Sequence, residues 1–240
     1  MARNILVTGG STGIGRAVAT VFAENNENVV ITGRRSQVLS ETANALGSNV
    51  HALVCDASDP IQIDACMEEL PNKIDVLVNC AGGDTDFGQP HAKELSIIAA
   101  NWHANLNSNL MSAVLMTEAV RRRLTNGGAV IHIGSIAADI GVGAYGAAKA
   151  ALASWNVGLA ASLGPTVTAN VISPGYIAQT DFFDGKLPVE VQTALVDATI
   201  TKRAGTPEDV ATTAYFLASG GARHITGQVI AVNGGERTTR

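Results

Sequence analysis

The stretch Thr8-Gly9-Gly10-Ser11-Thr12-Gly13-Ile14-Gly15 decides the fold of this chain, because it joins an apolar strand-like run to a helical segment. Glycines let a main chain approach a pyrophosphate closely, and the free N–H groups of a helix N-terminus bind anions. The glycine spacing is GxxxGxG rather than the commoner GxGxxG. Its position between strand and helix still predicts a dinucleotide-binding turn, with contacts from Gly9, Ser11, Thr12, Gly13, Ile14 and Gly15.

Apolar runs alternate with helical segments along the rest of the chain. The runs are continuously apolar, which is typical of parallel strands covered on both faces. Strands are expected at Asn4–Thr8, Val29–Thr32, His51–Cys55, Val76–Asn79, Ala129–Ile133, Thr168–Ile172 and Gln228–Val232. Helices are expected at Gly13–Glu24, Ser36–Leu46, Pro60–Glu69, Ile97–Leu124, Tyr145–Leu163 and Pro207–Ala218. The pattern predicts a single α/β domain, a Rossmann-like doubly wound parallel sheet of seven strands with helices on both faces.

Composition and charge limit the functions that the chain can serve. It has 240 residues, of which 46% are hydrophobic and 15% charged, so one large domain is expected over residues 1–240. The net charge of −5 argues against nucleic acid or an anionic membrane as a main partner. The basic cluster Arg121–Arg123 is expected at a helix end, where cations suit the dipole.

Cysteine and histidine usage predicts a reduced protein without a metal site. Cys55, Cys66 and Cys80 are an odd number with no CxxC, which is typical of buried thiols in a reducing compartment. The histidines are scattered without metal-ligand spacing. The first predicted strand begins almost at once, so no signal peptide is expected, and no apolar run is long enough to span a bilayer. These observations predict a cytoplasmic location.

The end of the second predicted strand indicates which dinucleotide is bound. Thr32-Gly33 is followed by Arg34 and Arg35, with no acid in the position where NAD-binding folds hold the ribose 2′-hydroxyl. A guanidinium suits the 2′-phosphate of NADP. NADP(H) is therefore favoured over NAD(H), with Arg34, which is nearer the strand end, preferred over Arg35 for the phosphate.

Tyr145-Gly146-Ala147-Ala148-Lys149 places two ionisable side chains on one helix face. A neighbouring ammonium favours a phenolate, so Lys149 is expected to lower the pKa of Tyr145 and poise it to exchange a proton with an alkoxide. Ser135, just past the fifth strand, is placed to hold a substrate oxygen. Taken alone, a tyrosine and a lysine at this spacing arise mostly by chance.

In its order of motifs the chain resembles the short-chain dehydrogenase/reductase family, in its small single-domain form. The resemblance runs from the glycine turn through Asp56-Ala57, Asn79-Cys80-Ala81-Gly82, Asn109, Ser135, Tyr145, Lys149, Pro174-Gly175 and Gly234-Gly235. It implies an oxidoreductase that interconverts a ketone and a secondary alcohol. Cysteine at position 80, where a second asparagine is common, Thr12 in place of a basic residue, and a short Ser135–Tyr145 interval depart from the pattern.

The resemblance also implies a role for each matched residue. Tyr145 would be the acid/base, Lys149 would hold the nicotinamide ribose, Ser135 would orient the carbonyl, and Asn109 would hold a water that relays protons. Further cofactor contacts are implied for Asp56, Ala57, Asn79, Ala81, Gly82, Pro174, Gly175, Ile177 and Thr180. The irregular stretch 176–205 is expected to be a substrate-binding lid.

Substrate and partners are less sharply indicated. The nearest functional neighbours by resemblance are 3-oxoacyl-[acyl carrier protein] reductases, but the helix after Lys149 lacks an expected arginine, so a free ketone or alcohol is an equal alternative. The family implies a homotetramer. A non-catalytic NADP-binding sensor on the same fold, an NAD-dependent alcohol or sugar dehydrogenase, and a sugar epimerase or dehydratase are the competing functions.

Overall fold

A computed structural model of the chain describes residues 2–90, 92–183, 185 and 187–238. The strands are β1 (Asn4–Thr8), β2 (Asn28–Gly33), β3 (Val50–Val54), β4 (Ile74–Asn79), β5 (Leu124–Ile133), β6 (Thr168–Pro174) and β7 (Val229–Val232). The α-helices are α1 (Gly13–Glu24), α2 (Ser36–Leu46), α3 (Pro60–Glu69), α4 (Leu95–Leu106), α5 (Ser112–Val120), α6 (Ala137–Ile140), α7 (Gly143–Leu163), α8 (Val189–Ala198) and α9 (Pro207–Leu217). A π-helical segment, η1 (Asn107–Met111), and the 3₁₀ turns η2 (Arg121–Arg123), η3 (Asp181–Phe183) and η4 (Gly220–Ala222) complete the elements.

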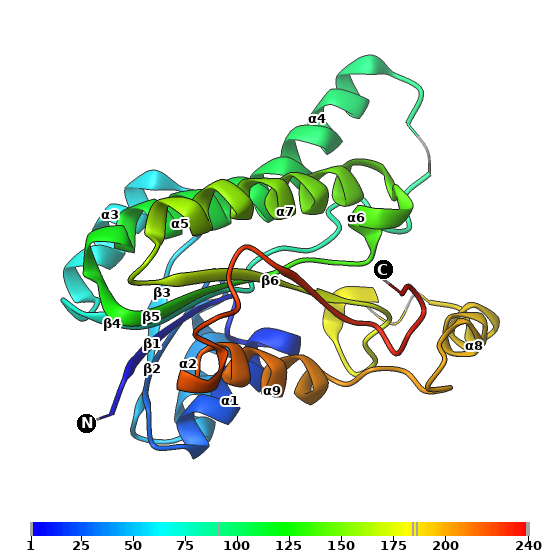
Figure 1. Ribbon diagram of the computed structural model, residues 1–240. Helices are drawn as coiled ribbons and strands as arrows, with labels where there is room; N and C mark the ends of the chain where they lie inside the picture. Colours follow the sequence, from blue (N-terminus) through cyan, green and yellow to red (C-terminus); the bar gives the residue numbers. More distant parts are fainter. Residues whose placement is uncertain (1, 91, 184, 186, 239–240) are drawn as a thin grey trace.

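The seven strands form one parallel sheet in the order β3-β2-β1-β4-β5-β6-β7. Helices α1, α2 and α9 cover one face, and α3, α5 and α7 cover the other (Figure 1). Successive strand residues point to opposite faces, so Ile5 and Val7 join one buried cluster and Leu6 joins the other. The predicted doubly wound sheet is confirmed.

The strand order reverses at β1, which has β2 on one side and β4 on the other. The helices that follow β1 and β4 lie on opposite faces of the sheet. This arrangement leaves a crevice at the carboxyl ends of these two strands. The glycine turn after β1 and the segment Cys80–Gly83 after β4 both open at this edge. The fold therefore brings the predicted dinucleotide turn to the usual ligand-binding edge of a doubly wound sheet.

The predicted helix Ile97–Leu124 is wrong in its extent. The structure divides this stretch into α4, η1, α5 and η2, and β5 begins at Leu124 rather than Ala129. Leu124 pairs with Ile74 of β4, and the Thr125 hydroxyl donates to Asp75 Oδ1 at 2.6 Å. These contacts from β4 extend the strand through Thr125-Asn126-Gly127-Gly128, which by its composition resembles a turn.

One helix end was predicted, and a second shows a defined cap. Arg121–Arg123 closes α5 as the turn η2, where Arg123 Nη1 donates to the Leu70 carbonyl at 2.9 Å. Thr206 begins α9 with a capping box that it forms with Asp209, and Pro207 occupies the first turn. Within the residues that the structure describes, no helix combines the length and the apolar character needed to cross a bilayer.

Candidate active site

The glycine turn is held against the end of β4 by main-chain contacts. Thr8 Oγ1 accepts hydrogen bonds from the N–H groups of Cys80 and Ala81, each at 3.1 Å. Gly9 adopts a φ of +65°, and a Cβ on it would stand 2.9 Å from Ala81. Only glycine fits so closely against another chain segment in this backbone conformation. Two of the predicted cofactor-binding segments, after β1 and after β4, are thus packed side by side.

The first turn of α1 has donors available for an anion. Thr12 occupies the N-cap position with an extended backbone, and its side chain makes no capping hydrogen bond to the described residues. The first N–H groups of a helix have no acceptor inside the helix. Ser11, 8% exposed, and Thr180, whose side chain lies 3.6 Å from where a Cβ of Gly13 would stand, border the same turn. The arrangement suits a pyrophosphate at the start of α1.

The two arginines after β2 point to different neighbours. Arg35 Nη2 lies 3.4 Å from Thr12 Oγ1, at the glycine turn, and 3.7 Å from Asp181 of the lid. Arg34 lies near Asp56, the residue after Cys55, and helps to hold the pKa of that carboxyl below its usual value. Hydrogen bonds from Ser58 to Asp56 act in the same direction, whereas burial opposes them. Of the two arginines, Arg35 contacts the glycine turn, whereas Arg34, which the sequence favoured, lies beside Asp56.

Two predicted cofactor residues turn their side chains into the core. Asn79, 4% exposed, donates from Nδ2 to Thr117 Oγ1 at 2.9 Å and lies 3.1 Å from His132 Nδ1. Ile177, 6% exposed, packs against Gly205 and belongs to the hydrophobic core. The cofactor contacts expected of Asn79 and Ile177 stay predictions, and the side chains of both residues lie in the core. Any contact of Asn79 or Ile177 with a cofactor would therefore come from the main chain.

The remaining predicted residues lie close to that edge. Gly175 donates from its N–H to the Val232 carbonyl at 3.1 Å, and the Ile136 N–H donates to Pro174 at 2.9 Å. This pairing fixes the segment after β6 beside the segment that carries Ser135. Ala57, 5% exposed, lies in the core cluster beneath Asp56.

Ser135, Tyr145, Lys149 and Asn109 converge at the carboxyl edge of the sheet. The Ser135 hydroxyl hydrogen-bonds the Tyr145 phenol. Lys149 is 5% exposed; its Nζ donates to the Ile133 carbonyl at 2.7 Å and lies 5.7 Å from the centre of the Tyr145 ring. Asn109 Oδ1 accepts from the Gly83 N–H at 2.9 Å, and a Cβ on Gly82 would meet both Asn109 and Lys149. The four predicted catalytic residues therefore form one cluster.

Burial dominates the proton affinities in this cluster. It raises the pKa of Tyr145 to about 12, and Asp84 and Cys80 act in the same direction, while the Ser135 hydrogen bond opposes them. Burial lowers the pKa of Lys149 to about 8. The predicted lowering of the Tyr145 pKa by Lys149 is therefore wrong for this structure. Burial raises the free energy of the phenolate by more than the nearby ammonium lowers it.

Comparisons with known proteins agree with this geometry. The family model described as Enoyl-(Acyl carrier protein) reductase matches residues 9–236. The chain belongs to the short-chain dehydrogenase/reductase family. It is 32% identical to the 3-oxoacyl-[acyl-carrier-protein] reductase FabG of Escherichia coli (strain K12) over 239 residues, 96% of this chain and 95% of the relative. The FabG of Aquifex aeolicus (strain VF5) is 34% identical over 243 residues, with the same coverage.

Solved structures of the short-chain dehydrogenase/reductase family match the whole fold. A Brucella melitensis structure described as a short-chain dehydrogenase/reductase, glucose/ribitol dehydrogenase, superposes with a TM-score of 0.87 at 30% identity, over 99% of this chain and 97% of that one. A 3-oxoacyl-[acyl-carrier protein] reductase from the same species superposes with a TM-score of 0.87 at 29% identity, over 97% and 90%. The chain is therefore an oxidoreductase of this family.

Asn105 is a residue of this short-chain dehydrogenase/reductase site that the sequence did not single out. It is fully buried; its Nδ2 donates to Asp86 Oδ1 at 2.7 Å and its Oδ1 accepts from the Thr85 N–H at 3.2 Å. Asn105 therefore fixes the β4–α4 loop beside the cluster, one helical turn from Asn109. Three asparagines within positions 105–109 were the available signal, but only the fold shows that two of them bind the same loop.

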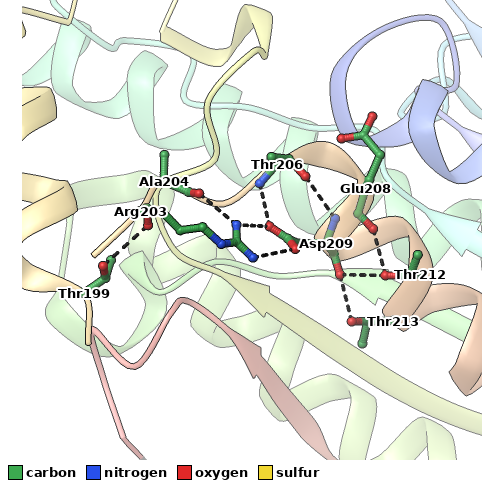
Figure 2. A network of polar contacts seen from close by, with 8 residues as sticks. All are labelled: Thr199, Arg203, Ala204, Thr206, Glu208, Asp209, Thr212 and Thr213. Atoms are coloured by element: carbon green, nitrogen blue, oxygen red, sulfur yellow. Dashed lines mark hydrogen bonds and ion pairs between the residues drawn. The ribbon is translucent and has the colours of Figure 1, made fainter. Parts of the chain in front are cut away.

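The lid of this family member is pinned at both ends. Ile177 forms an isolated parallel bridge with Gly205, so the segment between them leaves and returns at one point. At the return, Arg203 binds Asp209 of α9 through two nitrogens at 2.6 and 2.9 Å, and Asp209 Oδ2 also accepts from the Thr206 N–H at 2.9 Å (Figure 2). Both ends of the predicted lid are therefore fixed to the rest of the fold.

The Asp209 contacts predict a stability that depends on pH. Arg203 and the Thr206 N–H hold the pKa of Asp209 at about 2, below its unfolded value. The stabilisation is therefore present above about pH 4 and is lost as the pH falls towards 2. Asp209→Asn removes the charge but can still cap, so we expect its melting temperature to fall below that of the wild type at pH 7 and to match it near the folded pKa.

Two further variants complete the Asp209 experiment. Asp209→Ala also removes the acceptor for the Thr206 N–H, a hydrogen bond worth about 1 kcal/mol, and should melt lowest at pH 7. Glu208→Gln is the matched control, because the Glu208 side chain points away from Arg203 (Figure 2). Thermal unfolding followed by circular dichroism measures all three. A deficit of Asp209→Asn that does not change with pH would contradict the ion-pair explanation.

Proposed function

We propose that this chain transfers a hydride between NADP(H) and a ketone or secondary alcohol, with Tyr145 as the acid/base. The observation that carries the proposal is the convergence of the Ser135 hydroxyl, the Tyr145 phenol and the buried Lys149 amine at the carboxyl edge of the sheet. Hydroxyl donors at one point suit an oxygen that gains negative charge, as a carbonyl oxygen does when its carbon accepts a hydride.

The residues at the crevice fit a dinucleotide. A Cβ on Gly9 would collide with the turn after β4, and one on Gly15 would collide with the main chain of Gly9. The uncapped first turn of α1 offers N–H donors. Arg34 and Arg35 supply positive charge where a 2′-phosphate would lie, and Asp56 stands beside them for the adenosine end. When bound, the dinucleotide supplies or accepts the hydride.

The proton is handled by the side chains of the chain itself. Ser135 holds the substrate oxygen, and Tyr145 donates its phenolic proton to that oxygen as negative charge develops. A pKa of about 12 keeps Tyr145 protonated at neutral pH, in the form that can donate a proton during carbonyl reduction. Lys149, held by the Ile133 carbonyl with its Nζ 5.7 Å from the centre of the Tyr145 ring, supplies positive charge near the phenolate that this transfer leaves.

Asn109 has a positioning role in this proposal. Its Oδ1 accepts from the Gly83 N–H, and its Nδ2 donates to the Gly83 carbonyl at 2.9 Å and to the Asn105 carbonyl at 3.0 Å. Its amide group thus holds the segment after β4 beside Lys149. The proton-relaying water that the family resemblance implied for Asn109 stays a prediction.

A turnover screen tests the proposed function. The purified chain is mixed with NADPH or NADH and with an acetoacetyl thioester, cyclic ketones, aryl ketones and sugars, and loss of reduced cofactor is followed by absorbance. We expect oxidation of NADPH with at least one ketone. Binding of NADPH without turnover of any carbonyl would instead favour the sensor, and faster turnover with NADH would overturn the cofactor assignment.

Separate replacement of the two arginines tests the choice of cofactor. We expect Arg34→Ala and Arg35→Ala each to weaken NADPH binding about tenfold or more, because each removes a charge-assisted contact to the 2′-phosphate. Binding of NADH, which lacks that phosphate, should change little. Fluorescence titration of both nucleotides measures the effect, with the exposed Arg122→Ala of η2 as the control. Equal losses for NADPH and NADH would refute the assignment.

Assembly, carrier protein and location stay predictions. FabG relatives carry the acyl carrier protein in their names, and this supports an acyl-thioester substrate as one alternative to a free ketone. The homotetramer and the cytoplasmic location rest on family resemblance and on sequence composition.

A further inference from the structure

Aromatic side chains gather over the candidate active site. The sequence contains five Phe and three Tyr, and three of the Phe and two of the Tyr lie in this one place. The Phe182 ring is centred 5.5 Å from the Tyr145 ring and 4.8 Å from the Phe183 ring. Phe183 in turn lies 5.2 Å from Phe87 and 5.7 Å from Tyr176. We call these four residues around Tyr145, namely Phe87, Tyr176, Phe182 and Phe183, the aromatic shell.

Three separate chain segments build the aromatic shell. Phe87 comes from the β4–α4 loop, Tyr176 follows β6, and Phe182 and Phe183 form η3 of the lid. The β4–α4 loop is fixed by the buried Asn105 through Asp86, and the lid is pinned where Ile177 meets Gly205. All the rings are tilted or edge-on to one another, with interplanar angles from 45° to 79°. Such pairs gain energy from ring quadrupoles beyond the area that they bury.

The charge beside the aromatic shell is unfavourable to an anion. The Asp84 carboxylate lies close enough to Tyr145 to oppose formation of the phenolate. The Lys149 amine, the nearest cationic group described, is directed to the Ile133 carbonyl. Two described arginines are in ion pairs with segments close to the site: Arg35 with Asp181 of η3, and Arg237 with Asp139 of α6 at 3.6 Å. Among the residues that the structure describes, a substrate with a carboxylate or phosphate near its carbonyl would meet Asp84 with no unpaired arginine shown beside it to offset that charge.

We propose that the substrate is an uncharged aryl ketone whose ring is attached at or next to the reacting carbonyl. This inference rests on the proposed function, because it assumes that Ser135 and Tyr145 hold the carbonyl oxygen. A ring placed beside that oxygen would lie within stacking distance of Phe182, which stands 5.5 Å from Tyr145. A straight acyl chain gains no such ring contact.

Three ketones separate the aryl proposal from its alternatives. They are acetophenone, a straight-chain methyl ketone with the same number of carbons, and para-carboxyacetophenone. We expect kcat/KM for acetophenone to exceed that for the straight-chain ketone by about tenfold, the upper size of an aromatic-pair contribution. The carboxylated ketone should be reduced more slowly than acetophenone.

Variants of the aromatic shell test whether its rings cause the preference for acetophenone over the straight-chain ketone. Phe182→Leu and Phe87→Leu keep apolar volume but remove a ring, and we expect each to reduce the acetophenone preference severalfold while leaving the straight-chain ketone nearly unchanged. Phe216→Leu, exposed on α9 outside the aromatic shell, is the matched control. Asp84→Asn should speed reduction of para-carboxyacetophenone relative to acetophenone.

The outcomes also separate this inference from the function on which it rests. Equal kcat/KM for the aryl and straight-chain ketones in the wild type, or equal losses for both in Phe182→Leu, would overturn the aryl proposal and leave the reductase proposal intact. If neither these ketones nor an acetoacetyl thioester is turned over with NADPH, it is the proposed function that fails.

Discussion

Replacing Tyr145 with Phe is expected to lower kcat for ketone reduction by about 10²–10⁴-fold, the usual contribution of a general acid. The variant keeps the ring that packs 5.5 Å from Phe182, so the fold and the aromatic contacts should persist. It removes only the hydroxyl that hydrogen-bonds Ser135 and would protonate the developing alkoxide. NADPH binding should therefore change little.

Steady-state assays and NADPH titration on the same preparation measure the Tyr145→Phe effect. Tyr215→Phe is the matched control, because Tyr215 lies on α9 and packs against Phe22, 5.2 Å away, on the opposite face of the sheet. Near-normal turnover by Tyr145→Phe would sink the acid/base assignment. Loss of NADPH binding together with turnover would show that the hydroxyl serves binding rather than proton transfer.

Replacing Gly15 with Ala is expected to abolish most cofactor binding. A Cβ on Gly15 would collide with the Gly9 carbonyl oxygen and would stand 3.2 Å from Gly10 Cα. The nearest atoms all belong to the main chain, so the turn itself must move. Overpacking of this kind costs about 1–3 kcal/mol, which corresponds to about a ten- to hundredfold loss of NADPH affinity if the strain falls on the binding conformation.

Gly158→Ala is the matched control for the glycine turn. Gly158 lies within α7, and a Cβ there would meet nothing within 4 Å. Alanine is the better helix former, so this variant should gain about 0.5–1 kcal/mol of stability and bind NADPH normally. Isothermal titration with NADPH and thermal unfolding measure both variants. Wild-type affinity in Gly15→Ala would show that the turn after β1 does not hold the dinucleotide.

Residues that act through their main chain or through their position in a helix could be predicted from the sequence. The glycine turn could be recognised because its glycines are required by local geometry, whatever surrounds them. Tyr145 and Lys149 could be placed on one helix face because four residues make about one helical turn. The capping box at Thr206 depends in the same way on neighbours only three residues apart.

Contacts between distant segments could not be predicted in this way. The side chain of Asn79 turns into the core because Thr117 and His132, far away in sequence, offer it hydrogen-bonding partners. The strand β5 begins at Leu124 because Ile74 and Asp75 pair with it, although Gly127 and Gly128 suggest a turn. Asn105 matters because the β4–α4 loop folds back onto it.

The sequence by itself determined the doubly wound sheet, the glycine turn and the placement of Tyr145 and Lys149 on one helix face, because strand–helix alternation and short-range spacing are properties of neighbouring residues. The tertiary structure alone decided the proton affinity of Tyr145 and the aromatic shell above it. Burial raises the pKa of Tyr145 to about 12, and its ring is covered by Phe182 from the lid. Desolvation depends on which distant segments cover a group, and only the folded chain specifies that.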